Sequence, residues 1–244
     1  HCNLQCSYCQ NYQISDNRVS HPFHSMEPED VIAAVTRMLD QGINRVGFVS
    51  PSHFIPQMQV IIDIIHSLGY RPVWVYNTNG YDNPETLRML EGTIGVYLPD
   101  LKYLEPDLAH DLSGARDYPE FATKSIREMM RQKGAALITG DDGTAESGII
   151  VRHLVLPGHV ENSLKIMRFL AEEISPKIHV SLMAQYYPTS RVENHPQLSR
   201  CVSETEYRQV VDEMDNLGIR NGWIQEFESN EFYRPDFTKP HPFE

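Results

Sequence analysis

The feature that most restricts the fold is a regular alternation between short apolar stretches and longer amphipathic ones. The short stretches are rich in Val, Ile and aromatic residues, and they span 45–49, 72–76, 94–98, 149–156 and 178–184. The longer ones carry apolar residues at the spacing of one helical face, and they span 27–41, 56–68, 86–90, 119–132, 161–174 and 203–217. Strands that alternate with helices are joined by right-handed crossovers and form a parallel sheet. The sequence therefore predicts an α/β fold with five parallel strands, either an open sheet or a barrel.

One segment interrupts this alternation. Residues 135–147 contain the polar run Thr-Gly-Asp-Asp-Gly-Thr, which is typical of a tight turn and predicts a hairpin at the edge of the sheet. A chain of 244 residues can bury one substantial core. We expect one domain over 1–225, followed by a tail over 226–244.

Three of the four cysteines lie close together at the beginning of the chain. Cys2, Cys6 and Cys9 are spaced Cys-x3-Cys-x2-Cys on a segment with no helical or strand period. Three thiolates on one short loop favour a metal centre with one position that the protein leaves open. A structural zinc site completed by a histidine such as His1 is the alternative. Cys201 lies alone in a polar segment, and we expect it to be a free structural thiol.

The composition restricts the classes of partner that the protein can bind. The formal net charge is −12 and no cluster of Lys and Arg is present, which argues against a nucleic-acid partner. No apolar run is long enough to cross a bilayer, so we expect no membrane partner. Clustered cysteines are typical of a reducing compartment, and we expect a cytoplasmic protein. His21 and His24 are separated by Pro22 and are expected to be solvated rather than to bind a metal.

Polar residues follow each predicted strand. They occupy 50–53, 77–80, 100–102, 157–159 and 185–187. Because ligands collect beyond the carboxyl ends of parallel strands, we expect these segments to surround one binding site together with the cysteine loop. On the residues alone, 77–80 also fits an ordinary turn, His53 a surface histidine, and Asp100, Lys102 and Arg152 a purely structural ion-pair group.

The motifs together resemble a known family. The cysteine spacing, with aromatic Tyr8 before Cys9, resembles the radical S-adenosylmethionine superfamily. The runs Cys-Asn-Leu-x-Cys-x-Tyr-Cys-Gln-Asn, Asn-Thr-Asn-Gly, Leu-Pro-Asp-Leu-Lys-Tyr and Arg-His-Leu-Val-Leu-Pro-Gly look like the branch related to pyruvate formate-lyase activating enzyme. The resemblance extends from Cys2 to about Trp223.

The resemblance implies both cofactors and chemistry. Cys2, Cys6 and Cys9 would hold a 4Fe-4S cluster whose fourth iron binds the amino and carboxylate groups of S-adenosylmethionine. Reductive cleavage would give methionine and a 5′-deoxyadenosyl radical that abstracts hydrogen from a protein or small-molecule substrate, such as a glycyl residue of a partner protein. The implied partners include an electron donor such as flavodoxin or ferredoxin. The alternative is a non-catalytic iron-sulfur or zinc scaffold whose nucleotide site has degraded.

The resemblance also implies roles for individual residues. Tyr8 would lie against the cluster and the adenine region, and Lys102 and Arg152 would balance the methionine carboxylate. Asp100 falls near the methionine end, while His159 and Tyr186 are candidates for the ribose and adenine regions. Two segments depart from the family pattern: Ser50, Ser52 and His53 stand where many relatives have Gly-Gly-Glu, and Asn77-Thr78 stands where the activating enzymes have Asp-Thr, which puts their cation site in question.

The superfamily places the cysteine loop after the first barrel strand, but only His1 precedes Cys2 in this sequence. We therefore expect a partial (βα)6-type open TIM-like barrel whose first strand is missing from this chain. The remaining five parallel strands would leave an exposed edge along 45–49.

Overall fold

The structure is a computed structural model that describes residues 1–18, 26–227, 229, 235–237 and 239. The histidines at 21 and 24 and much of the expected tail over 226–244 lie outside the described residues.

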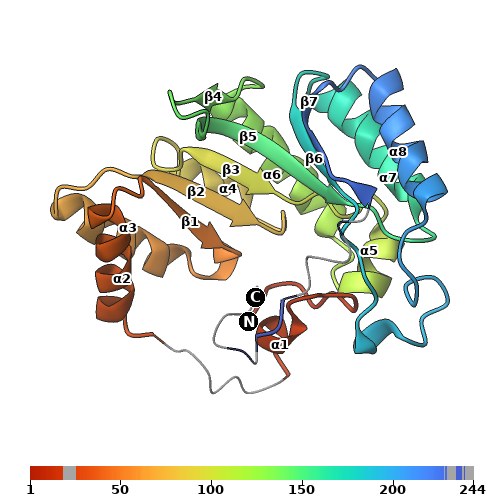
Figure 1. Cartoon of the computed structure of the whole chain (residues 1–244), viewed down its shortest axis with the longest axis horizontal. Helices are drawn as coiled ribbons and strands as arrows, with labels where there is room; N and C mark the ends of the chain where they lie inside the picture. The colour runs from red at the N-terminus through yellow and green to blue at the C-terminus, as the bar shows by residue number, and fades with distance from the viewer. Residues whose placement is uncertain (19–25, 228, 230–234, 238, 240–244) are drawn as a thin grey trace.

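A parallel sheet organises the chain (Figure 1). Its strands are β1 (Arg45–Val49), β2 (Val73–Thr78), β3 (Val96–Pro99), β5 (Ala145–Leu154), β6 (His179–Met183) and β7 (Asn221–Ile224). They are hydrogen-bonded in the order β1-β2-β3-β5-β6-β7, and each neighbouring pair is parallel. Since β1 and β7 stand at opposite ends of this order, the sheet is open. The expected open, partial TIM-like α/β fold is confirmed, and all five predicted strands are present.

The sixth parallel strand, β7, was missed by the sequence analysis. All four of its residues are exposed, so they show no alternation of apolar and polar positions. Gly222 adopts φ +115°, and a Cβ there would stand 2.0 Å from the carbonyl oxygen of Val180 on β6. This close approach of two backbones requires glycine, a residue that normally weakens a strand prediction.

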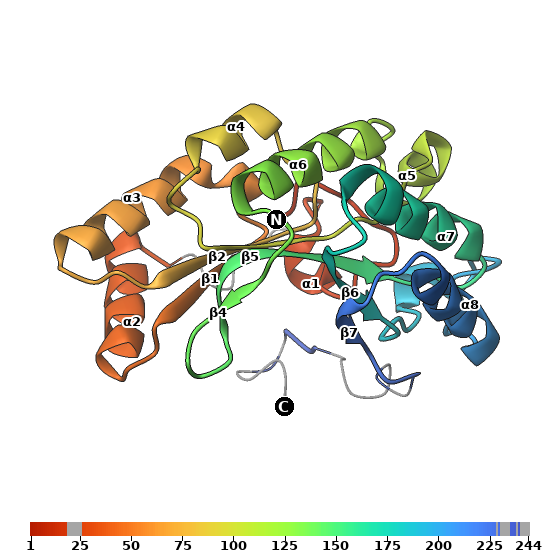
Figure 2. The ribbon, with the colours of Figure 1, turned by 90° about the horizontal axis from the view of Figure 1, so that it is seen from above.

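Helices cover the strands mainly on one face. They are α1 (Tyr12–Ser15), α2 (Pro28–Asp40), α3 (Ile55–Ser67), α4 (Pro84–Met89), α5 (Pro106–Ser113), α6 (Tyr118–Lys133), α7 (Val160–Phe169), extended by a π-helical turn over Leu170–Ile174, and α8 (Glu204–Asn216). Figure 2 shows α3 to α7 lying along the same side of the sheet. The core fills the space between these layers, and β2 contributes Trp74 and Tyr76, both almost completely buried.

The described residues include the predicted hairpin and the predicted unpaired edge of the sheet. β4 (Ile138–Thr139) pairs antiparallel with the beginning of β5, so the polar turn connects two antiparallel strands. Within the described residues, β1 pairs only with β2, and its other edge carries no strand.

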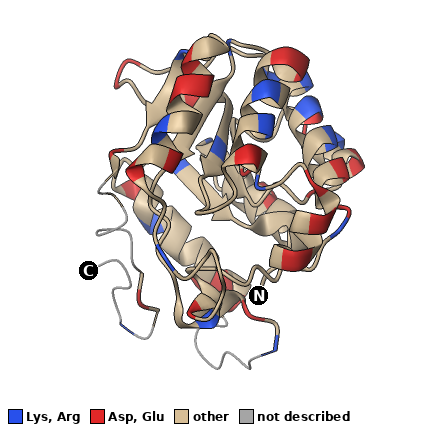
Figure 3. Cartoon of the chain, turned by 90° about the vertical axis from the view of Figure 1, so that its right-hand side faces the viewer, with Lys and Arg blue, Asp and Glu red and all other residues tan. Residues whose placement is uncertain are grey.

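The described helices include none that is both long and apolar enough to cross a membrane. On the side seen in Figure 3, basic and acidic residues are interleaved along the helices. Arg168 on α7, for example, lies 2.6 Å from Glu213 on α8.

Candidate functional site

The cysteine loop lies beyond the carboxyl ends of the strands, with α1 immediately after it (Figure 1). Two backbone hydrogen bonds attach it to the end of α5, from Gln5 N to Ser113 O (3.3 Å) and from Ser7 N to Leu112 O (2.8 Å). Asn3 Nδ2 donates to Tyr81 O at 2.8 Å and so joins the loop to the segment after β2. The loop is therefore held between the end of α5 and the segment that follows β2.

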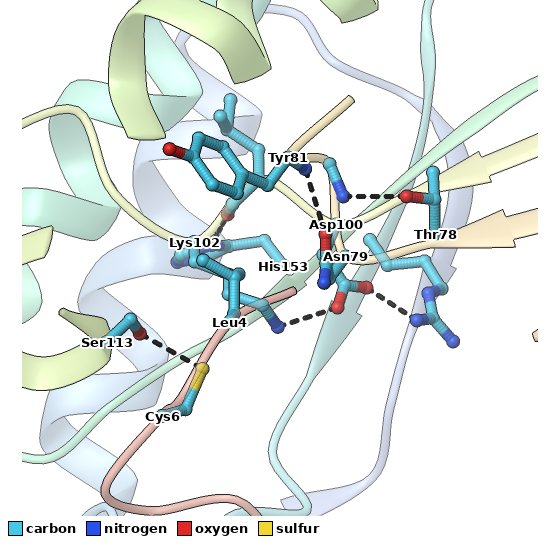
Figure 4. A network of polar contacts seen from close by, with 12 residues as sticks. Leu4, Cys6, Thr78, Asn79, Tyr81, Asp100, Lys102, Ser113 and His153 are labelled. Atoms are coloured by element: carbon cyan, nitrogen blue, oxygen red, sulfur yellow. Dashed lines mark hydrogen bonds and ion pairs between the residues drawn. The ribbon is translucent and has the colours of Figure 1, made fainter. Parts of the chain in front are cut away.

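Each of the three sulfur atoms has a hydrogen-bond partner outside the cysteines. Asn79 Nδ2, which follows β2, donates to Cys2 Sγ at 3.3 Å. Ser113 Oγ, at the end of α5, donates to Cys6 Sγ at 3.0 Å (Figure 4). Cys9 Sγ lies 3.2 Å from the hydroxyl of Ser15, the last residue of α1. Such partners around metal-binding residues orient them and adjust their charge.

The three thiols act on one another electrostatically. Burial raises the pKa of Cys6 to about 11, while the positive charge of Lys102 and the hydrogen bond from Ser113 oppose that rise. Charges on Cys9 and Cys2 raise the pKa further, so the three sulfurs are within electrostatic reach of each other. A bound metal would have to displace the proton of Cys6.

The donor set fits a multinuclear centre. The described part of the chain contains no group of three or more His, Cys, Asp or Glu residues that could hold a metal ion as it stands. A tetrahedral zinc site brings all its ligands to about 2.3 Å or less from one point, whereas an iron-sulfur cluster distributes its cysteines over different iron atoms. Cysteine thiolates are the usual ligands of iron-sulfur clusters, and three of them on one short loop can each bind a different iron atom.

A group of charges lies beside the loop. Asp100, just after β3, is 2.7 Å from Lys102 Nζ (Figure 4). It is also 2.6 Å from Arg152 Nη2 on β5. Burial would raise the pKa of Asp100, but the positive charges of Arg152 and Lys102 outweigh it and hold the pKa below its usual value. One carboxylate faces two cations, so the group carries a net positive charge next to the cysteines.

A buried carboxylate that the sequence analysis missed lies in the turn after β2. Asp82 accepts hydrogen bonds from Thr78 Oγ1 at 2.6 Å and from Tyr76 OH at 2.7 Å. Ser52 Oγ lies 3.2 Å from Thr78 Oγ1, so two expected cofactor-binding residues meet here. Burial raises the pKa of Asp82. Because the Asp82 carboxylate accepts its hydrogen bond, the Thr78 hydroxyl is held in one orientation.

The segment after β1 has an unusual backbone. Ser50 adopts φ +53°, the single non-glycine residue with positive φ among those described, and its N–H donates to Asn77 O at 2.7 Å. Strain of this kind is frequent where a segment contacts a ligand. His53 is exposed, and its ring centroid lies 4.0 Å from that of Phe54.

The two expected tyrosines are already engaged inside the protein. Tyr8 and Tyr186 are 5% and 0% exposed, and their ring centroids lie 6.1 Å apart, edge to face. Tyr8 OH is 2.6 Å from Tyr103 OH, and Tyr186 OH donates to Leu198 O at 2.6 Å. Both hydroxyls are therefore already engaged, and both residues are buried. His159 occupies the N-cap position of α7.

Sequence reasoning also missed Asn79 as a cysteine partner, and it assigned no role to Tyr103, Ser113 or Ser15. A signal for α5 was present, since Pro106 begins it and Gly114, at φ +72°, ends it. Nothing local indicated that the end of α5 would meet Cys6.

Comparison with known proteins decides the family. The model of the Radical SAM superfamily matches residues 1–170. The chain belongs to this superfamily. Radical SAM membership implies an enzyme that uses S-adenosylmethionine with an iron-sulfur cluster. The match includes the cysteine loop, Asp100, Lys102 and Arg152.

Individual relatives are distant. An uncharacterized protein of Methanocaldococcus jannaschii is 25% identical over 222 residues, which cover 86% of this chain and 59% of that protein. The structure of Streptococcus suis SuiB bound to S-adenosylmethionine has a TM-score of 0.62 at 14% identity and covers 93% of this chain and 48% of SuiB. TYW1 with a lysine-pyruvate adduct has a TM-score of 0.58 at 15% identity, covering 94% and 74%. The chain thus spans about half to three quarters of these relatives, and the likeness to the solved structures shows the fold.

Proposed function

We propose that the chain binds a 4Fe-4S cluster through Cys2, Cys6 and Cys9 and binds S-adenosylmethionine across the strand ends, in order to generate a 5′-deoxyadenosyl radical. The observation that supports this most strongly is the position of three thiols on one loop, beside the positively charged group of Asp100, Lys102 and Arg152. The cluster, when bound, supplies one electron that breaks a carbon-sulfur bond of the sulfonium and releases methionine. Hydrogen abstraction from a substrate would convert this radical to 5′-deoxyadenosine.

The chain's own residues would position the nucleotide. Lys102 and Arg152 supply positive charge for the methionine carboxylate, and Asp100 supplies a carboxylate for the amino group. Asn77, Thr78, Ser50 and Ser52 present hydroxyl, amide and backbone groups at the neighbouring strand ends. Tyr8 and, behind it, Tyr186 form an aromatic wall, and His53 lies at the exposed rim.

Anaerobic reconstitution tests the cofactor assignment. We expect about four iron and four sulfide per chain, and 5′-deoxyadenosine once dithionite and S-adenosylmethionine are added. Cys6→Ala should lose the cluster and the product, whereas Cys201→Ala, which changes the cysteine outside the loop, should keep both. A colourless protein that retains zinc would refute the cluster.

The substrate is proposed from the motifs. The resemblance to activating enzymes supports a glycyl residue of a partner protein as the hydrogen donor. Electron paramagnetic resonance (EPR) of a candidate glycyl-radical partner, after incubation with the reduced enzyme and S-adenosylmethionine, should show a glycyl radical. Turnover of a small metabolite without that signal would indicate the other substrate class.

A non-catalytic scaffold is the second candidate, and one observation favours it. Asp100 pairs with both cations, so neither Lys102 nor Arg152 presents its charge alone to a ligand. Equilibrium binding of S-adenosylmethionine to the reconstituted protein separates the two functions, because a scaffold with a degraded nucleotide site binds none.

The remaining partners are also proposals. We propose that flavodoxin or ferredoxin supplies the electron, and that the protein is cytoplasmic and binds neither nucleic acid nor membrane. The net charge of −12 supports the absence of a nucleic-acid partner. Reduction by a purified flavodoxin or ferredoxin, in place of dithionite, tests the electron donor.

A further inference from the structure

A continuous chain of hydroxyl groups ends on one cysteine sulfur. Tyr8 OH lies 2.6 Å from Tyr103 OH, which lies 2.7 Å from Ser113 Oγ, which in turn lies 3.0 Å from Cys6 Sγ. The three residues come from the cysteine loop, the segment after β3 and the end of α5. From this we infer that Tyr8, Tyr103 and Ser113 form a relay that raises the reduction potential of the cluster ligated by Cys6. The inference rests on the proposed function, since it requires the cluster.

The direction of the relay follows from hydrogen-bond chemistry. A cysteine bound to iron is a thiolate and can only accept, so the Ser113 hydroxyl must donate to it. Ser113 Oγ then accepts from Tyr103 OH, and Tyr103 OH accepts from Tyr8 OH. All three O–H bonds consequently point toward the sulfur. Hydrogen bonds aligned in this way polarise one another and strengthen the last one.

Burial makes the hydrogen bond from Ser113 to Cys6 stronger than the hydrogen bonds to Cys2 and Cys9. Tyr103, Ser113 and Tyr8 are 0%, 2% and 5% exposed. The Tyr103 ring also packs edge to face against Tyr118, with centroids 5.4 Å apart, which holds the middle of the relay in place. Because these side chains are buried, solvent screens the hydroxyl dipoles only weakly, and their effect on the sulfur is large.

The hydrogen bonds to the other two sulfurs are less buried than the one to Cys6. The Asn79 amide nitrogen that donates to Cys2 also donates to Asn3 Oδ1, at 2.6 Å. Its contact with Cys2 is only partly buried. The contact between Ser15 and Cys9 is also only partly buried. Removing the Ser113 hydroxyl should therefore change the reduction potential more than removing the donor to Cys2 or to Cys9.

The relay should favour the reduced cluster. Reduction adds one negative charge that spreads onto the sulfurs, and a donor that faces a sulfur stabilises that charge. Ser113→Ala should make reduction about tenfold less favourable, which corresponds to a potential about 59 mV more negative for one electron. Tyr103→Phe should shift the potential in the same direction by less, because Ser113 still donates but has lost its own donor.

Matched controls separate this electronic role from a structural one. Ser125→Ala removes a buried serine hydroxyl that donates to Asp82 O at 2.9 Å, and Tyr97→Phe removes a buried tyrosine hydroxyl that donates to Gln132 Oε1 at 2.8 Å. Neither donates to a cysteine. Both should lower the melting temperature as the test variants do, but leave the potential at the wild-type value.

The experiment is an EPR-monitored redox titration of the reconstituted wild type and the four variants, with iron content and melting temperature measured on each. Potentials more negative in Ser113→Ala and Tyr103→Phe than in their controls, at equal iron content, support the relay. Equal potentials in a wild type and variants that all carry the cluster overturn the relay and leave the proposed function standing. A wild type that binds no cluster overturns both. If Ser113→Ala does not retain iron, Tyr103→Phe decides, because it preserves the contact with Cys6.

Discussion

Asp100 and Arg152 are joined twice, through backbone and through side chains. They form a parallel bridge beyond the end of β3, in which Leu101 N donates to Arg152 O at 2.9 Å. Their side chains meet at 2.6 Å. β3 and β5 pair directly at only two positions, Val96 with Gly148 and Tyr97 with Ile149. The Asp100–Arg152 contact therefore extends the junction of these strands to the candidate binding site.

This contact predicts the effect of neutralising the carboxylate. Asp100→Asn leaves the cations of Lys102 and Arg152, which are 19% and 29% exposed, without a countercharge. Removing one partner of a buried ion pair is strongly destabilising, and we expect a loss of about 2–3 kcal/mol in the free energy of unfolding. Anaerobic urea unfolding of the cluster-free protein measures it. As the control, Glu120→Gln breaks the exposed pair with Lys124 and should lower it by less than about 1 kcal/mol. Equal effects of the two variants would contradict the role of Asp100.

The buried carboxylate of Asp82 predicts a second effect. In Asp82→Asn, an amide nitrogen replaces one acceptor oxygen, so either Thr78 or Tyr76 loses its partner. We expect the affinity for S-adenosylmethionine to fall about tenfold, equivalent to about one hydrogen bond, with the cluster retained. Calorimetric titration measures this affinity. Asp63→Asn, at an exposed position of α3, should bind as the wild type does, and unchanged affinity in Asp82→Asn would remove Thr78 from the binding site.

Gly80 predicts a third effect, on the turn that carries Asn79. Gly80 has φ +84°, and a Cβ there would stand 2.1 Å from the carbonyl oxygen of Asp100. Gly80→Ala must therefore move the turn, pull Asn79 away from Cys2 and lower iron retention. Gly92→Ala is the matched control, because Gly92 has φ +80° but no atom within 4 Å of its added Cβ. It should show only the conformational penalty of about 1–2 kcal/mol and full iron content. Iron analysis and urea unfolding distinguish the two variants.

His153 predicts how stability depends on pH. Its ring is buried, its Nδ1–H donates to Leu101 O at 2.7 Å, and the Nε2 of the neutral ring therefore accepts from Ser163 Oγ at 2.9 Å. Burial lowers its pKa from the usual 6.5 to about 4, although the contact with Leu101 and the charge of Asp100 oppose this shift. Between pH 6.5 and about 4 the unfolded chain binds a proton that the folded chain does not.

The contribution of His153 is therefore complete above pH 6.5 and is lost as the pH falls toward about 4. We expect roughly 1–3 kcal/mol of acid-dependent destabilisation from this residue. Urea unfolding at several pH values should show a shallower dependence in His153→Gln than in the wild type. Substitution of the exposed His110 by Gln should leave the wild-type slope, and an equal slope in His153→Gln would contradict the assignment.

The sequence by itself determined the elements and the chemistry of their ends. Apolar periodicity predicted five of the parallel strands and most helices, because buried faces impose that spacing wherever an element packs on a core. Polar segments such as Asp100–Lys102 could be assigned to one edge, since parallel strands all end there. The spacing of Cys2, Cys6 and Cys9 indicated a metal centre, because ligands on one short loop need no tertiary contact to come together.

Only the tertiary structure decided which side chains meet. Ser113 reaches Cys6 across 107 residues, and Tyr103 reaches Tyr8 across 95, through contacts that no local pattern encodes. Asp82 is a buried acceptor because β2 and its following turn bring two hydroxyls to it, whereas in sequence it is an ordinary turn residue. β7 shows no period because all its residues are exposed, and it is held by backbone pairing with β6 and by a hydrogen bond from Asn221 Nδ2 to Lys177 O. Periodicity reports burial on one face of an element, but the partners of a buried polar group depend on how distant segments pack.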